Sequence, residues 1–381
     1  MKKLINKIFS KNDVNNDRQI EIDIAKAICI FGMAIVHIFE TGLLLNPSFG
    51  EGEFLSYLFV YILNTCFGAS IFMVCMGLGL AYTKKSSPMQ IIKRGFVMFL
   101  ASFVFNFFRF TIVDILTEAS AGEFNVPYLV SSVFFVDILT FAGLALMLFG
   151  LLKLFKTPYW LLLIIALSMS TLGTIFQAIP TNSWAATLFI CPFLPVAKDP
   201  IIDYNAYFPL FNWFIFVVLG YGFGLLLKKV QNKGLFYAIV SGVCGLFAII
   251  YLAICIPNKC GLCYPELANT MFIKIYDALI CFVIAIAVFG LYYALSHVLP
   301  KVIKKFISFL SKGITGFYVI HWLTISALGI VALSIDETWQ IPNVYVCLPI
   351  GIGVFVISCL ILFAFNKIKE KIKLKHANKT V

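Results

Sequence analysis

The chain has 381 residues, of which 61% are hydrophobic and 12% are charged. Soluble domains are about one quarter charged, so this composition indicates a polytopic integral membrane protein and excludes an ordinary soluble enzyme. The net charge of +11 does not indicate a nucleic-acid partner, because Lys and Arg gather in short segments between apolar stretches. We therefore predict an all-α bundle of transmembrane helices whose main environment is the lipid bilayer.

The N-terminal segment is polar and basic, and it lacks the apolar core and cleavage site of a secretory signal peptide. Its stretch from Lys2 to Lys11, KKLINKIFSK, has two interpretations, an amphipathic helix on an anionic membrane surface or a solvated tail. No internal repeat and no appended soluble domain is visible. We expect an N-terminal tail (residues 1–23), one transmembrane domain (24–366) and a basic C-terminal tail (367–381).

The first apolar stretch, Arg18 to Glu40, carries ionisable side chains near one helix face. Lys26 and His37 are eleven residues apart, almost three helical turns, so about 16 Å separates them along the axis. Asp23 precedes Lys26 by three residues, and Glu40 follows His37 by three. Ionisable groups in lipid usually face a protein interior or a water-filled cavity, which favours a function for this set. Alternatively, Asp23 and Lys26 mark the helix entry at the headgroups, and His37 bonds a neighbouring helix.

About ten stretches are apolar and long enough to cross a bilayer, which requires about 20 residues each. The connecting segments alternate between Lys-rich and nearly Lys-free, so the positive-inside rule places both termini in the cytosol. Pro349, Gly351 and Gly353 are expected to break the tenth span. The ten stretches cover residues 24–45, 55–82, 95–116, 129–152, 158–178, 208–227, 235–256, 271–296, 313–334 and 344–366.

Polar side chains inside the later spans are the next candidates. Arg109 lies in the third span, Asp137 in the fourth, and Tyr318 and His321 in the ninth. Each is a functional candidate by its location in lipid. Each is equally well explained as a tether between helices, and Arg109 would form a structural pair with Asp137 or Asp114.

Trp213 follows a long outer loop that is rich in Pro and aromatic residues. Such aromatic residues either form an interfacial belt or offer stacking surfaces to a sugar. A second outer loop carries Cys260 and Cys263, which leaves three pairings open: with each other, with Cys255 or with Cys191. Zinc would require two further ligands and no His is nearby, so no metal is predicted.

The first span reads IDIAKAICIFGMAIVH and resembles the opening of the transmembrane acyltransferase group. This group includes the acyltransferase-3 family and the heparan-alpha-glucosaminide N-acetyltransferase-like proteins. Its pattern is Asp, two residues, Arg, ten residues and His. Asp23 and His37 match, while Lys26 replaces the Arg, which keeps the charge and loses the bidentate fork. A later match is SKGITGFYVIHWL, which resembles the family's Gly-x-x-Ser-x-x-x-Tyr-x-x-His pattern without its Ser and contains Tyr318 and His321.

The resemblance implies transfer of an acyl group, with acetyl expected, from cytosolic acyl-CoA to a hydroxyl or amine of an extracytoplasmic sugar or glycolipid. His37 would act as the general base or carry the acyl group covalently. Glu40 and Asp23 would complete the catalytic set. The residues expected to bind the CoA phosphates are Lys26, Lys93 and Arg94. The residues expected to bind the acceptor are Arg109, Asp137, Trp213, Tyr318 and His321.

A proton-coupled secondary transporter or flippase is the alternative, because intramembrane Lys and His also suit proton transfer. Many secondary transporters show inverted repeats and broken helices at matching positions in two halves, and no such match is visible here. The expected location is a bacterial plasma membrane. The acceptor, the acyl chain and the oligomeric state remain open at this stage.

Overall fold

The computed structural model describes residues 2–45, 68–84, 86–115, 125–176, 183–195, 206–258, 260–263, 273–335, 341 and 344–377. These residues form helices and no β-strand, apart from one isolated bridge between Phe9 and Val230. The predicted all-α membrane class is confirmed. The helices are α1 (Lys2–Ile8), α2 (Ile20–Leu45), α4 (Ser70–Tyr82), α5 (Pro88–Asn106), η2 (Phe107–Thr111), α7 (Val126–Val133), α8 (Ile138–Leu154), α9 (Tyr159–Ile175), α10 (Trp184–Ile190), α11 (Leu210–Lys229), α12 (Lys233–Cys255), η3 (Gly261–Cys263), α13 (Ile275–Val298), α14 (Lys301–Lys312), α15 (Ile314–Ile335) and α16 (Val344–Ala377).

Seven helices of the described residues are long and apolar enough to cross a membrane, or up to eight if α7 and α8 form one bent span. The expected count of about ten is therefore not confirmed. Two of the expected spans appear as shorter apolar helices, α4 and α9. Residues 55–67, the first half of the second expected span, lie outside the described residues.

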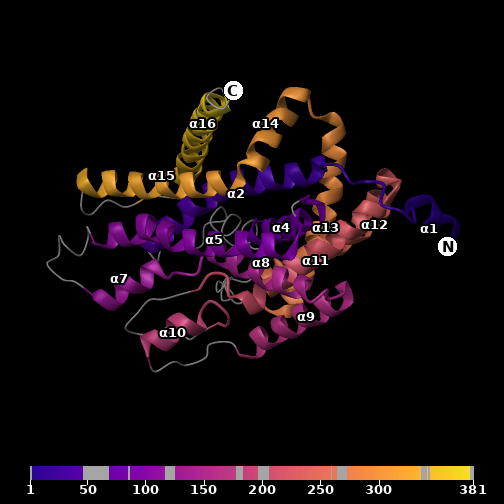
Figure 1. Ribbon diagram of the computed structural model, residues 1–381, viewed down its shortest axis with the longest axis horizontal. Coiled ribbons are helices and arrows are strands. Elements are labelled where there is room, and N and C mark those ends of the chain that lie inside the picture. The colour runs from indigo at the N-terminus through magenta and orange to yellow at the C-terminus, as the bar shows by residue number, and fades with distance from the viewer. Residues whose placement is uncertain are drawn as a thin grey trace. The chain divides into compact units, whose positions relative to one another are not determined.

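The chain divides into two compact units, which we describe separately. Unit 1 comprises Met1–Ala25 and Thr65–Val298, and unit 2 comprises Lys26–Asn64 and Leu299–Val381. In unit 1, α4 packs against α11, α5 against α8, α9 against α11, and α12 against α13 (Figure 1). In unit 2, α15 packs against α16.

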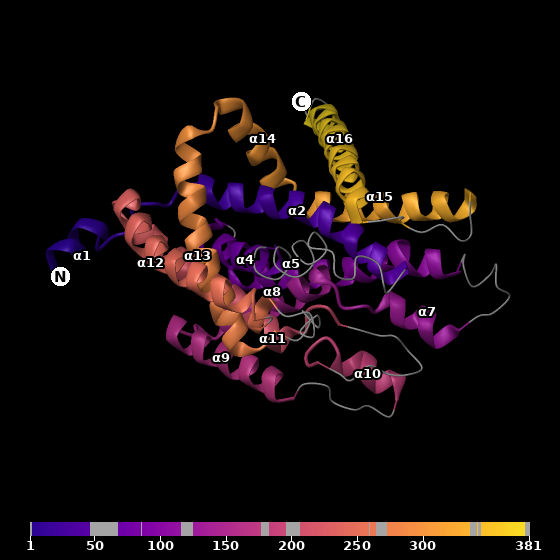
Figure 2. The same cartoon turned by 180° about the vertical axis from the view of Figure 1, so that it is seen from behind.

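Glycine residues allow two helix pairs of unit 1 to approach closely. A Cβ atom on Gly77 of α4 would collide with the backbone of Val217 in α11, and one on Gly220 would collide with the backbone of Val74. Gly143 of α8 faces the backbone of Phe99 in α5 in the same way. Figure 2 shows these helices from behind, again with α5 beside α8. Small residues of this kind are the usual means of close helix packing in membranes, where hydrophobic burial gives little driving force.

The expected fourth span is not one straight helix, because α7 and α8 meet at a bend of 55°. Asp137 begins α8, where its Oδ1 accepts the backbone N–H groups of Leu139 and Thr140 at 2.9 and 3.0 Å. Asn106 of α5 donates to the carbonyl oxygens of Val133 and Phe135, at 3.1 and 2.8 Å. The break is therefore stable in lipid because polar side chains satisfy the backbone groups that it frees.

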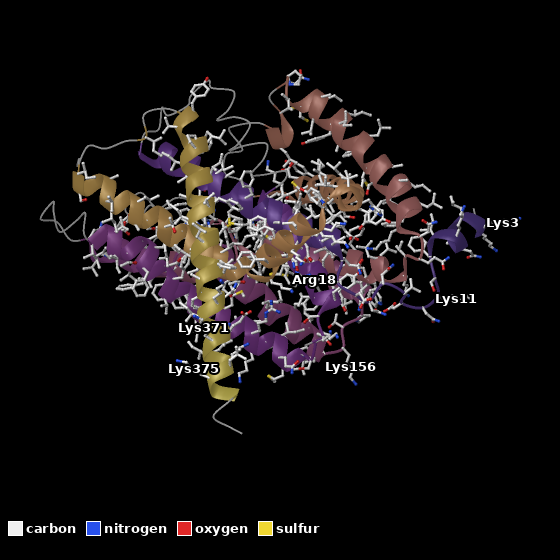
Figure 3. The ribbon with its side chains drawn as sticks, turned by 90° about the horizontal axis from the view of Figure 1, so that it is seen from above. Lys3, Lys11, Arg18, Lys156, Lys371 and Lys375 are labelled. Atoms are coloured by element: carbon white, nitrogen blue, oxygen red, sulfur yellow. The ribbon has the colours of Figure 1, made fainter. Side chains whose placement is uncertain are left out.

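The N-terminal segment is bound to the turn between α11 and α12. The carbonyl oxygen of Ile8 accepts the backbone N–H of Gln231 at 2.8 Å, and the N–H of Ser10 donates to Lys229 at 2.8 Å. Asn15 donates its side-chain amide to the carbonyl oxygen of Val230. Lys3 and Lys11 mark this segment in Figure 3. Backbone groups within residues 8–15 are thus hydrogen-bonded to unit 1, and the two interpretations of the stretch from Lys2 to Lys11 stay predictions.

The expected break in the tenth span is wrong, since α16 runs without interruption from Val344 to Ala377 with Pro349 inside it. Pro349 lies in the second turn, where the missing N–H removes one helical hydrogen bond. Gly351 instead serves packing, because a Cβ atom there would lie 2.7 Å from the Cα of Ile35 in α2. The helix also continues past residue 366, where we expected a separate tail to begin.

Candidate active site

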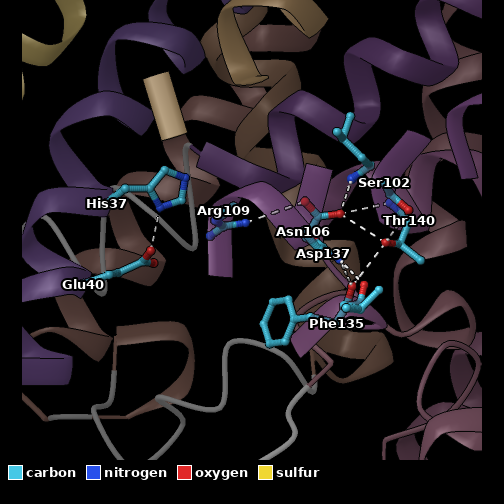
Figure 4. Close-up of polar contacts among 10 residues, drawn as sticks. His37, Glu40, Ser102, Asn106, Arg109, Phe135, Asp137 and Thr140 are labelled. Carbon is cyan, nitrogen blue, oxygen red and sulfur yellow. Dashed lines mark hydrogen bonds and ion pairs between the residues drawn. The ribbon is translucent and has the colours of Figure 1, made fainter. Parts of the chain in front are cut away.

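His37 and Glu40 form a close polar pair in unit 2. They lie one turn apart on α2, and the Nδ1 of His37 is 2.6 Å from the Oε2 of Glu40. Both side chains are partly accessible, at 17% and 29% (Figure 4). Beside an ionised carboxylate, which only accepts hydrogen bonds, Nδ1 is the nitrogen that carries the proton. In the neutral ring this arrangement leaves the lone pair on Nε2, the nitrogen that would take a proton from a substrate.

Two side chains of α15 pack against the His37 ring, and a third packs against one of these two. The ring of His321 stacks on it with centroids 5.4 Å apart, and Trp322 lies 4.2 Å away. Tyr318 meets His321 edge-to-face at 5.4 Å. His321 is fully buried, and its Nδ1 donates to the carbonyl oxygen of Phe317 at 3.1 Å. The structure thus brings together the predicted residues His37, Glu40, Tyr318 and His321.

Trp322 is the site residue that the sequence reasoning missed. Its ring faces His37, and an imidazolium formed there would be attracted to the aromatic face. The available signal was its place directly after His321, but one turn of helix contains several such neighbours. Only the pairing of α2 with α15 distinguishes Trp322 from the other aromatic residues.

Asp23 is engaged at the start of α2. Arg18 binds it with two hydrogen bonds, Nε to Oδ2 at 2.5 Å and Nη2 to Oδ1 at 2.9 Å. The nearby Glu21 is buried and pairs with Lys233 of α12 at 2.5 Å. This geometry agrees with the interpretation of Asp23 as a helix-entry residue, and its catalytic role stays a prediction.

The three cations expected to bind CoA occupy different surroundings. Lys26 is half-buried on α2, one turn after Asp23, while Lys93 and Arg94 are exposed on α5. Lys26 belongs to unit 2 and the other two belong to unit 1. Among the described residues, no group of three or more His, Cys, Asp or Glu side chains is arranged to hold a metal ion.

Arg109 and Asp137 form the second polar site, inside unit 1. The Nη1 of Arg109 is 3.7 Å from the Oδ2 of Asp137, and both side chains are almost fully buried (Figure 4). The π-helical segment η2 carries Arg109, and the ring of Phe110 lies 4.1 Å from its guanidinium. Thr140 donates to Asp137 Oδ1 at 3.2 Å. These contacts agree with a structural pair, and binding of an acceptor by the two residues stays a prediction.

Trp213 and the cysteines have mainly structural surroundings. Trp213 is buried on α11 between Phe208 and Phe216, with centroids at 5.0 and 5.4 Å. Cys191 and Cys260 are both free thiols, as is Cys255, so none of the expected bridges to them is formed in the structure. The side chain of Cys263 lies outside the described residues. Burial raises the pKa of the Cys191 thiol to about 12.

A family model described as an acyltransferase domain matches residues 19–363. The chain belongs to the acyltransferase-3 family. Comparison with curated proteins and with solved structures gives no match. The family match contains the His37–Glu40 pair and the α15 cluster, and it confirms the resemblance read from the first span. An acyltransferase-3 domain, with seven or eight candidate membrane spans among the described residues, makes this protein a membrane acyltransferase.

Proposed function

We propose that the protein transfers an acetyl group from cytosolic acetyl-CoA to a hydroxyl or amine of an extracytoplasmic sugar or glycolipid. The observation that carries the proposal is the 2.6 Å contact between His37 Nδ1 and Glu40 Oε2, inside an acyltransferase-3 domain. This contact orients the imidazole and leaves Nε2 as the proton acceptor. Imidazole is the side chain that most often serves as a general base in enzymes.

In the proposed reaction, Nε2 of His37 takes the proton of the acceptor hydroxyl or amine while the acceptor atom attacks the thioester carbonyl. The carbon–sulfur bond breaks, and the CoA thiolate takes the proton back from the imidazolium. Glu40 stabilises the imidazolium through the Nδ1 proton, and Trp322 faces the charged ring at 4.2 Å. His37 is therefore the catalytic residue, and Glu40 and Trp322 are positioning residues.

The donor is proposed to bind through its phosphates to Lys26, with Lys93 and Arg94 as further candidates. The half-buried position of Lys26 supports this role, because a partly desolvated ammonium binds phosphate more strongly than an exposed one. Tyr318 and His321 are proposed to contact the acceptor, since His321 stacks on the His37 ring and Tyr318 packs against His321. Arg109, Asp137 and Trp213 remain candidates for binding the acceptor, and the contacts that the structure shows for them are within unit 1.

The test uses membrane vesicles with the cytosolic face outward, prepared from cells that make the protein and supplied with acetyl-labelled acetyl-CoA. We expect label in the carbohydrate or glycolipid fraction. Mild base would release an O-acetyl ester and leave an N-acetyl amide, which identifies the acceptor atom. Vesicles that contain His37→Ala are the control. Equal labelling of that fraction in both preparations would contradict the proposal.

A further inference from the structure

Helix α14 has the pattern of a helix that lies on a membrane surface. It has 12 residues, KVIKKFISFLSK, which is too short to cross a bilayer of about 30 Å. Lys301, Lys305 and Lys312 follow one another on one face at helical spacing. Val302 and Phe306 lie on a separate face one turn apart. Gly313 then joins α14 directly to α15, one of the candidate spans, so α14 ends where a span begins.

The apolar side of α14 is only partly covered by the protein. Ile307 and Leu310 are buried, at 9% and 2% exposure. Val302, Ile303 and Phe306 remain 75%, 41% and 43% exposed. We call Val302, Ile303 and Phe306 the exposed apolar strip of α14. Exposed apolar side chains beside lysines are unfavourable in water and favourable at the boundary between headgroups and acyl chains.

The basic end of α16 continues the same surface within unit 2. Phe309 of α14 meets Phe363 of α16 edge-to-face at 6.3 Å, and the Nζ of Lys367 lies 4.5 Å from the Phe363 ring. The 34 residues of α16 extend about 50 Å, which exceeds the hydrocarbon core. Lys371 and Lys375 lie on this projecting end (Figure 3). Together α14 and residues 364–377 carry nine lysines, four and five respectively, against the single acidic residue Glu370.

We propose that α14, with the basic end of α16, docks on the anionic lipid headgroups of the adjacent leaflet. Val302 and Phe306 enter the acyl-chain boundary, and the lysines reach the phosphates. Juxtamembrane lysines attract anionic lipid by about 1 kcal/mol each near the surface, or about fivefold in affinity. An acidic protein or a nucleic acid explains the lysines but not the exposed apolar strip. The proposal depends on the membrane location and is independent of the proposed acyl transfer.

The role of the lysine charges of α14 is tested with the full-length protein in bilayers that contain spin-labelled phosphatidylglycerol, which is anionic, or spin-labelled phosphatidylcholine, which is not. We expect wild-type protein to immobilise phosphatidylglycerol preferentially. Replacing Lys301, Lys304, Lys305 and Lys312 with Gln should lower that preference about fivefold or more. The matched control replaces the same four residues with Arg, which keeps the charge and should keep the preference. Equal preference in the Gln and Arg variants would overturn the proposal.

Insertion is tested with native lysines in place, so a folding defect of the Gln variant does not affect it. A photoreactive phenylalanine analogue at Phe306 should crosslink to lipid acyl chains upon illumination. The same analogue at Lys301, on the basic face, should give no acyl-chain crosslink. Lipid crosslinks at Lys301 but not at Phe306, or none at either position, would contradict the orientation that we propose.

Discussion

At the scale of single residues, Asp137 has two structural tasks. It caps α8 through two backbone N–H groups, and it holds the buried Arg109 at 3.7 Å. An N-cap contributes about 1 kcal/mol, whereas removing one partner of a buried ion pair costs about 3–5 kcal/mol. The ion pair should therefore dominate the effect of substitution at this position.

We expect Asp137→Asn to destabilise the protein clearly, because the amide keeps the cap but leaves the Arg109 charge without its carboxylate. The double variant Arg109→Met with Asp137→Asn should be more stable than Asp137→Asn alone, since the buried charge is removed as well. The thermal unfolding temperatures of the purified variants give their order of stability. If Asp137→Asn unfolds at the wild-type temperature, the ion pair between Arg109 and Asp137 does not contribute to stability.

The cysteines allow a second test at this scale. The raised pKa of Cys191, about 12, keeps that thiol protonated at pH 8, and its side chain is buried. Cys260 is exposed. Alkylation at pH 8 followed by peptide mass spectrometry should modify Cys260 rapidly and Cys191 only after denaturation. Rapid labelling of both residues would show that the packing around Cys191 is wrong.

At the scale of elements, the contact between α4 and α11 depends on glycine. Gly77→Ala and Gly220→Ala place a methyl group against the opposite backbone and should lower the unfolding temperature strongly. Gly79→Ala is the matched control, because a Cβ atom at Gly79 has nothing within 4 Å and Ala favours the helix by about 1 kcal/mol. The same unfolding temperature for Gly77→Ala and Gly79→Ala would contradict the close packing.

The helical elements were largely predictable from the sequence, because long apolar stretches in lipid have few alternatives to a helix. The bends and breaks within the predicted spans were not predictable from the sequence. The bend before α8 arises from Asp137 and Asn106 acting together across two helices, whereas Pro349 causes no break near the start of α16. Similarly, the His37–Glu40 contact follows from local spacing, but the position of Trp322 over His37 depends on a contact between helices far apart in sequence.

At the scale of the whole molecule, the alternation of Lys-rich and Lys-poor connections predicts that both termini are cytosolic. Single-cysteine variants in intact cells test this orientation. An impermeant thiol reagent should label a protein with Cys260 as its one cysteine from outside. It should label Lys84→Cys or Lys3→Cys only after the cells are permeabilised. The reverse pattern would invert the direction of the proposed transfer.

The donor contact is a further prediction at this scale, because it places CoA on the cytosolic side of α2. Lys26→Ala should mainly weaken acetyl-CoA binding, and Lys26→Arg should be tolerated since the cation remains. Equilibrium binding of acetyl-CoA to the purified variants measures this directly. An unchanged affinity of Lys26→Ala for acetyl-CoA would show that Lys26 does not bind the donor.

The central claim is that His37 is the base. The decisive measurement is acetyl transfer by His37→Ala in the vesicle assay, with acetyl-CoA affinity of the purified variant measured in parallel. His297→Ala is the matched control, since His297 is an exposed imidazole at the end of α13. We predict that His37→Ala loses about 10²–10⁴-fold in transfer with unchanged donor affinity, while His297→Ala keeps full activity. Full transfer activity in His37→Ala would contradict the account and leave His37 as a helix-packing residue.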